Sequence, residues 1–336
     1  GGGSVSLLPL IDDARGLFHR IIVESGSPSF TCTKEDAKYL TDRIKLLTGI
    51  DSVEGLMKLS EKQLMQLNNK VSVHNRFPMR DGVIIPLDPY DSYRTGAAKD
   101  IDMLIGTNKD EARYWIYNFG SLTVFKIALN VWYENILNAL SPVERRSLDS
   151  FTHNYPKGKF WGRVEIINEL MFRSPAIAMV ENHAASGGKA YMYYWTQKAG
   201  MHHVGACHCV ELAYVFNNLQ ETIYTGGLVN GTLAKEVQNM WVNFAKTGNP
   251  STDHHIWPEY NPYERRTLSL GKRICDFTDP LPRQRKLIGP LVPHFISTLF
   301  DRLDLNVPYI RKRVIGSIAA AVITAAIAKC IRNNNT

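Results

Sequence analysis

His208 is a histidine whose neighbours in the sequence are of the types found at proton-transfer sites. It lies in the segment Gly205-Ala206-Cys207-His208-Cys209, and an apolar run follows the segment. The ordinary pKa of a histidine is close to neutrality, so its imidazole can take up and return a proton at physiological pH. A histidine in a loop before a helix can equally be structural, and one motif does not separate these interpretations. A catalytic interpretation therefore needs partners elsewhere in the chain.

Two acids, Asp110 and Glu111, follow a short apolar run at residues 101–107. The run predicts a buried strand, and functional groups collect beyond the carboxyl ends of strands in open parallel sheets. A carboxylate at such a place can orient an imidazole and stabilise its protonated form. Both acids are equally eligible by position, and either can instead be an acid at a helix N-terminus, favoured by the helix dipole.

A nucleophile to match this acid and base is missing from the sequence. A hydrolase of the α/β type carries its serine in Gly-x-Ser-x-Gly, followed along the chain by the acid and then the histidine. The motif does not occur in the 336 residues: Ser4 has Gly2 before it but Ser6 after it, and Ser27 lacks the glycines of the motif. The residues therefore offer an acid and a base, in that order, without a serine.

Composition and charge describe a globular protein with a basic end. The chain is 44% hydrophobic and 21% charged, which is ordinary for a folded domain. Its formal net charge is +7, and residues 281–336 hold nine lysines and arginines against two acids, so the remainder is neutral. No basic patch with interleaved aromatic residues is present, and we expect no nucleic-acid partner.

The cysteines predict neither a disulfide framework nor a metal site. There are five, an odd number with irregular spacing. Cys207, His208 and Cys209 stand close together, with His202 and His203 nearby, but no second close pair completes a tetrahedral shell. We therefore expect no metal, and keep a metal-binding module built on these three residues as the least favoured alternative.

The pattern of apolar runs predicts an α/β fold with a largely parallel sheet and flanking helices. Strands separated by long helical stretches are typical of that class. The expected strands lie at residues 18–23, 101–107, 189–196 and 268–270, and the expected helices at 33–47, 52–59, 60–67 and 233–246, with helices dominating 122–185. Thr33 with Asp36 predicts a capping box, and Gly248 a helix C-terminus.

Several motifs in order resemble the type-B carboxylesterases, the α/β-hydrolases that include the cholinesterases and para-nitrobenzyl-esterase-like enzymes. The matching segments are Gly1–Val5, Phe18–Pro28, Asp81-Gly82 with Pro86, Gly106–Glu111, Gly205–His208 with Glu211-Leu212, Trp241–Pro250 and Trp257–Tyr260. The first resembles the residues that follow the family's nucleophile elbow. The resemblance covers roughly residues 1–280, and it places a partial α/β-hydrolase domain at 1–305 and a basic, apolar tail at 306–336.

The resemblance implies a serine esterase that acts on small-molecule carboxylic esters without any cofactor. Glu111 is the triad acid and His208 the base, while the nucleophilic serine and the oxyanion loop would precede Gly1 and are absent from this chain. Glu211 is expected either to support the histidine loop or to cap the next helix, and Ser25 either to border the acid or to serve a turn. Cys209 stands where the family often has glycine, and its larger side chain could press on the site wall.

Two further possibilities stay open from the sequence. Because the family also contains cholinesterase-like binding proteins, the alternative is a noncatalytic interaction protein, although the presence of both Glu111 and His208 favours the enzyme. The apolar run 314–328 follows Arg311-Lys312-Arg313. It is shorter than the ~20 residues of a spanning helix, so it is either a weak membrane-surface anchor or a helix docked on the body.

Overall fold

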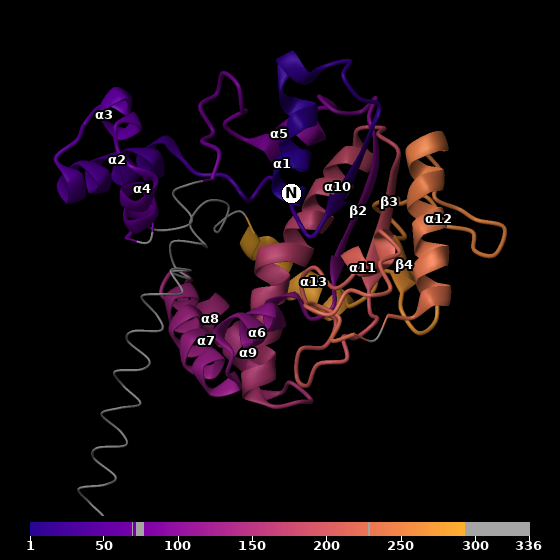
Figure 1. Cartoon of the computed structure of the whole chain (residues 1–336). Coiled ribbons are helices and arrows are strands. Elements are labelled where there is room, and N and C mark those ends of the chain that lie inside the picture. The colour runs from indigo at the N-terminus through magenta and orange to yellow at the C-terminus, as the bar shows by residue number, and fades with distance from the viewer. Residues whose placement is uncertain (69, 72–76, 228, 293–336) are drawn as a thin grey trace, which may run out of the picture.

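A five-stranded sheet forms the centre of the protein. The computed structural model describes residues 1–68, 70–71, 77–227 and 229–292. The strands are β1 (Arg20–Glu24), β2 (Asp102–Asn108), β3 (Ala190–Trp195), β4 (Arg266–Leu270) and β5 (Cys275–Thr278), and they lie side by side in chain order (Figure 1). The first four are parallel and β5 is antiparallel to β4. The prediction of a largely parallel α/β sheet is confirmed, and β5 is a strand that was not predicted.

Most of the helices lie in the connections between the strands, while α1 precedes β1 and α13 follows β5. They are α1 (Gly2–Leu7), α2 (Lys34–Thr48), α3 (Val53–Met57), α4 (Glu61–Asn68), α5 (Pro89–Arg94), α6 (Tyr114–Phe119), α7 (Leu122–Leu137), α8 (Pro142–His153), α9 (Lys159–Asn168), α10 (Ser174–Ala185), α11 (Leu212–Val215), α12 (Gly231–Thr247) and α13 (Pro282–Ile288). Short 3-10 turns lie at Leu8–Leu10, Asp12–Ala14, Glu111–Arg113 and Gly289–Leu291, and a π-helical turn at Glu169–Arg173 joins α9 to α10. Thr33 caps α2 in a capping box with Asp36, and Gly248 ends α12 in the left-handed conformation, both as predicted.

The two faces of the sheet pack against different helices. Along β2, Met103 and Ile105 join a core that contains Tyr93 of α5, while the intervening Leu104 joins a core that contains Phe244 of α12. Alternate side chains of a strand point to opposite faces, so a sheet covered on both sides needs a continuous apolar run. Because β2 and β3 are parallel neighbours, their carboxyl ends lie at the same end of the sheet, and the segments that contain Glu111 and His208 follow these ends.

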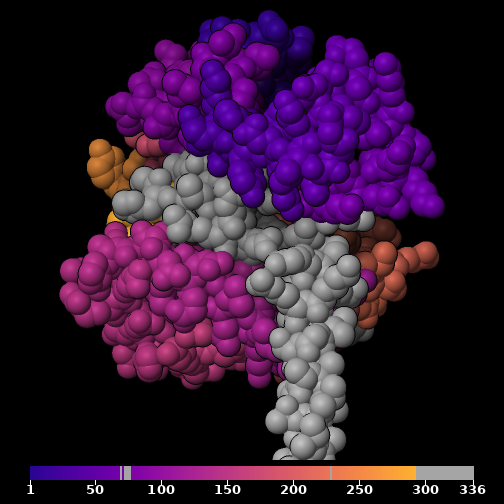
Figure 2. Space-filling view, turned by 90° about the vertical axis from the view of Figure 1, so that its left-hand side faces the viewer, coloured from indigo at the N-terminus to yellow at the C-terminus, as the bar shows by residue number. Residues whose placement is uncertain are grey.

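Two helical units stand beside the sheet. The unit of α2, α3 and α4 contains no buried residue in any of its helices. The unit of α6 to α9 has its own core around the fully buried Trp132. Figure 2 shows residues 34–68 and 122–168 as two separate masses on one side of the molecule. Only the second unit continues, through the π-helical turn, into a helix that packs on the sheet.

The predicted boundary at 305/306 and the apolar run 314–328 lie outside the described residues. Within the described part of the chain, no helix combines the length and apolar character needed to cross a bilayer.

His183, at the end of α10, is expected to make stability depend on pH. The side chain has no exposed surface, and burial lowers the pKa of His183 below its ordinary value of 6.5. The unfolded chain then binds a proton that the folded chain does not bind at His183, so the contribution of His183 to the free energy of unfolding should fall as pH drops below about 6.5. Urea unfolding at pH 7.5 and 5.5 measures this slope.

From pH 7.5 to pH 5.5, the free energy of unfolding of the His183→Gln variant should fall less, or rise more, than that of the unmodified protein, because the variant lacks the buried imidazole. The exposed His153 provides the control, and His153→Gln should keep the original slope. Equal slopes in His183→Gln and the unmodified protein would contradict the assignment.

Candidate active site

Glu111 lies just beyond the carboxyl end of β2, in the 3-10 turn Glu111–Arg113, and is completely buried. Its Oε1 accepts two hydrogen bonds, from the Asn108 backbone N–H at 2.7 Å and from Ser25 Oγ at 2.5 Å. Ser25 follows β1 with φ of 49°. Of the two roles expected for Ser25, the structure shows contact with the acid. The two donors fix the carboxylate and leave Oε2 for another partner.

That partner is His208, which lies in the loop after β3. Its Nδ1 is 2.7 Å from Glu111 Oε2, and its side chain retains 31% exposure. Burial by itself lowers the pKa of His208, but the Glu111 carboxylate and the Cys209 side chain outweigh this and raise the pKa well above its ordinary value. The rings of Tyr114 and Phe172 pack at centroid distances of 5.9 and 5.1 Å from the imidazole. The imidazole is therefore held from two sides and oriented by one carboxylate.

Asp110, the acid that position alone left equally eligible, has a different task. Its Oδ2 accepts a hydrogen bond from the Ala206 N–H at 3.0 Å, and its Oδ1 forms an ion pair with Arg113 at 2.8 Å. The Asp110 N–H donates in turn to the Ala206 carbonyl at 2.9 Å. Asp110 thus fastens the histidine loop to the acid turn, and of the two acids Glu111 is the one that contacts His208.

Glu211 is linked to the loop of His208 through the side chain of Asn108. It is 2% exposed, and its Oε2 accepts a hydrogen bond from Asn108 Nδ2, which also donates to the Cys207 carbonyl at 2.8 Å. Burial, with the nearby Glu111 carboxylate, raises the pKa of Glu211. Glu211 stands at the N-terminus of α11 without a side-chain capping bond. Glu211 therefore contacts the same Asn108 side chain that binds the histidine loop, and it makes no capping bond.

A cavity of about 560 Å³ opens beside His208. Most of its lining is aromatic or aliphatic. It is formed by Gly1 to Val5, Ile22, Glu24, Ser25, Phe30, Phe77, Pro78, Tyr114, Trp115, Met171, Phe172, His208, Cys209, Glu211 and Leu212. The start of α1 lines this cavity, and Gly26, two residues after β1, packs so closely on the backbone of Gly2 that no room is left for a Cβ atom. Such a cavity suits an uncharged, largely apolar ligand.

The cysteines beside His208 are placed by the backbone. Cys209 has φ of 70°, a conformation that favours glycine, and it is one of the residues that line the cavity. Cys207 is 1% exposed, so its thiol belongs to the core. Among the residues that the structure describes, no three His, Cys, Asp or Glu side chains are grouped so as to hold a metal ion.

Sequence reasoning missed three polar residues at this site. Glu24 and Asn108 are the last residues of β1 and β2. Their position at the carboxyl ends of parallel strands could have indicated that they belong to the site. Glu24 lines the cavity and accepts a hydrogen bond from Trp241 Nε1 at 2.8 Å. Asn168, which contacts the acid turn from α9, carried no local signal, since nothing in a helical pattern indicates a distant polar partner.

Comparisons with known proteins show the family to which the chain belongs. The model of the carboxylesterase family matches residues 1–286. Para-nitrobenzyl esterase of Bacillus subtilis is 30% identical over 311 residues, which cover 86% of this chain and 60% of that protein. Neuroligin-3 of human, rat and mouse is 25% identical, over 81% of this chain and 38% of theirs.

Solved structures show the same likeness. A para-nitrobenzyl esterase structure has a TM-score of 0.68 at 27% identity, covering 86% of this chain and 61% of its own. The Geobacillus stearothermophilus carboxylesterase EST55 has a TM-score of 0.74 at 26% identity, covering 85% and 62%. The fold is that of the α/β-hydrolases, and the chain spans about 60% of the length of the first of these relatives.

Proposed function

Since this chain belongs to the carboxylesterase family, we propose that it carries the acid and the base of a carboxylic-ester hydrolase, with a serine outside these 336 residues as the nucleophile. The observation that carries the proposal is the 2.7 Å contact between the buried Glu111 carboxylate and His208 Nδ1, beside an apolar cavity. The substrate class is a small carboxylic ester.

The geometry supports a proton relay of the serine-hydrolase kind. A serine hydroxyl attacks the ester carbonyl while His208 takes its proton, and His208 then returns the proton to the leaving alcohol. Glu111 holds the imidazole in the required tautomer and stabilises its protonated form. Water repeats the two steps on the acyl-enzyme and releases the carboxylic acid. No residue of this relay requires a metal or an organic cofactor.

The place of the nucleophile is supported by the lining of the cavity. Gly1, Gly2 and Gly3 line the cavity that His208 faces, and these residues resemble the segment that follows the family's serine. Two serines near the acid are poorly suited, because Ser25 donates its hydroxyl to Glu111 and Ser27 is completely buried. Ser4 lines the cavity and is the one to test.

Noncatalytic binding is the competing proposal, and the relatives that this chain matches include neuroligin-3 as well as esterases. A protein that only binds has no need to keep a carboxylate and an imidazole in contact inside a cavity. The intact Glu111–His208 pair therefore supports the hydrolase proposal over this alternative.

Turnover of a p-nitrophenyl ester tests both proposals. Residues 1–336 alone should hydrolyse it no faster than their His208→Ala variant, because the relay lacks a nucleophile. Joining the upstream Gly-x-Ser-x-Gly segment of a para-nitrobenzyl esterase before Gly1 should produce turnover that His208→Ala abolishes. Turnover by residues 1–336 that Ser4→Ala removes would place the nucleophile inside the chain, and a folded but inactive joined protein would favour noncatalytic binding.

A further inference from the structure

Asn168 connects the unit of α6 to α9 to the turn that carries Glu111. It is the last residue of α9, at the start of the π-helical turn, and is 5% exposed. Its Oδ1 accepts a hydrogen bond from the Ala112 N–H at 2.7 Å, and its Nδ2 donates to the Lys109 carbonyl at 3.2 Å. The Asn168 amide thus binds the backbone just before Asp110 and just after Glu111.

The acid turn needs an outside partner of this kind. The first N–H groups of a helical turn have no partner within the turn, and are usually satisfied by a capping side chain. Asp110 is at the capping position of Glu111–Arg113 but makes no side-chain capping bond, since its carboxylate binds Ala206 and Arg113. Ala112 is completely buried, so water cannot replace the missing cap, and Asn168 supplies it.

The direction of the Asn168 amide is fixed by its two backbone partners, and Glu165, three residues earlier on α9, lies beside its NH₂ group. Glu165 Oε2 accepts from Asn168 Nδ2 at 3.4 Å, while Glu165 Oε1 accepts from Gln284 at 3.4 Å. The Lys109 carbonyl can only accept and the Ala112 N–H can only donate, so the NH₂ group of Asn168 must face the Lys109 carbonyl. The Oδ1 atom is then directed to the Ala112 N–H.

From these contacts we infer that Asn168 is a positioning residue. It holds the acid turn, Glu111–Arg113, in the position in which Glu111 Oε2 contacts His208 Nδ1. Asn168 is not part of the cavity lining, so it acts through Glu111 and not on a substrate. Its importance for catalysis rests on the proposed function, whereas its effect on the Glu111–His208 contact does not. The inference links the packing of the helical unit to the geometry of the acid–base pair.

Titration of the His208 imidazole by NMR in the 336-residue protein tests the inference without any need for ester hydrolysis. The signal is assigned with His208→Gln. Because a carboxylate in contact shifts a pKa by about 1–3 units, a displaced Glu111 in Asn168→Ala should lower the pKa of His208 by about one unit. In the serine-bearing joined protein, the same variant should lower kcat by about 10²-fold, with KM little changed.

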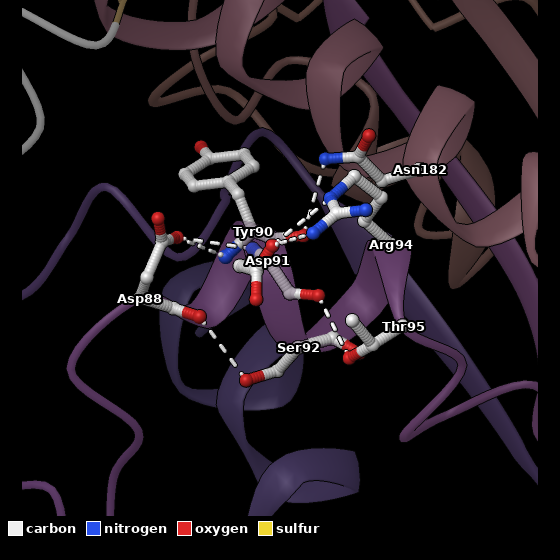
Figure 3. Close-up of polar contacts among 7 residues, drawn as sticks. All are labelled: Asp88, Tyr90, Asp91, Ser92, Arg94, Thr95 and Asn182. Carbon is white, nitrogen blue, oxygen red and sulfur yellow. Dashed lines mark hydrogen bonds and ion pairs between the residues drawn. The ribbon is translucent and has the colours of Figure 1, made fainter.

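Asn182 of α10 provides a matched control. It is an asparagine whose Nδ2 donates to a backbone carbonyl, that of Tyr90 in α5, at 3.2 Å (Figure 3). Asn182→Ala should leave the His208 titration unchanged even where it weakens the fold. A structural role alone would affect stability in both variants and the His208 pKa in neither.

A second variant keeps the test decisive if Asn168→Ala does not fold. Asn168→Thr retains one uncharged hydrogen-bonding oxygen and should give a smaller shift in the same direction. A folded Asn168→Ala or Asn168→Thr protein with an unchanged His208 pKa would overturn the inference. If the pKa shifts but the joined protein stays inactive, the positioning role stands and the proposed function fails.

Discussion

In the serine-bearing joined protein, His208→Ala is expected to lower kcat by about 10⁶-fold and Glu111→Gln by about 10⁴-fold. Without the imidazole, nothing removes the proton from the serine hydroxyl. Glutamine at 111 keeps the shape of the side chain but loses the charge that holds the tautomer and stabilises the imidazolium. Turnover of a p-nitrophenyl ester at saturating concentration measures both effects.

A second histidine–carboxylate pair in the same chain provides the control. His255 Nδ1 lies 2.8 Å from Glu236 Oε1, and the two residues line a different cavity beside α12. The two pairs share residue types and contact length, so they differ only in their surroundings. His255→Ala should leave kcat within about twofold, because surface changes away from a site have small effects. A loss as large as that of His208→Ala would mean that both variants damage the fold, and the assignment of the base would fail.

Glu169→Ala is expected to lower the free energy of unfolding by about 3–5 kcal/mol, because it leaves Arg173 charged and buried. The two side chains are 2% and 5% exposed, and Arg173 Nη1 lies 3.1 Å from Glu169 Oε1. Ser174 Oγ donates to the same carboxylate at 3.1 Å, and Arg173 also donates to the Pro280 carbonyl. Equilibrium urea unfolding measures the loss.

Two further variants separate the buried pair from a general effect of removing an acid. Replacing both partners, as in Glu169→Met with Arg173→Leu, should recover most of the loss, because the uncompensated charge is gone. The exposed pair of Asp91 and Arg94 on α5 is the surface control (Figure 3), and Asp91→Ala should cost about 1 kcal/mol or less. A small loss in Glu169→Ala would show that water reaches Arg173.

Most of the sheet could be predicted from the sequence because its strands are locally encoded. β2 and β3 are apolar runs closed by turn residues, and each was placed to within one residue of its observed bounds. β5 was missed because it has no such pattern: at the edge of the sheet, its residues are half-buried or exposed. A strand with one partner and little buried surface leaves no apolar periodicity to find.

The site was predictable where position along the chain decides it, and not where a distant contact does. Glu111 and His208 follow two parallel strands, β2 and β3. Functional groups collect beyond the carboxyl ends of such strands, and this rule predicted that the two residues lie close together. The choice between Asp110 and Glu111 depends on Ala206, about a hundred residues away, which occupies the Asp110 carboxylate. The part played by Asn168 likewise depends on a contact that no local pattern records.

The order of the strands in the sheet has a consequence for the synthesis of the protein. Because β1 to β5 lie in chain order, each strand leaving the ribosome finds its neighbour already made, and none has to insert between two paired strands. The partners are nevertheless far apart in sequence, with the whole unit of α6 to α9 between β2 and β3. Pairing over such distances is slow, and chains fold from the N-terminal side as they emerge. The histidine loop follows β3, so the acid and base can meet before α12 and β4 have been translated.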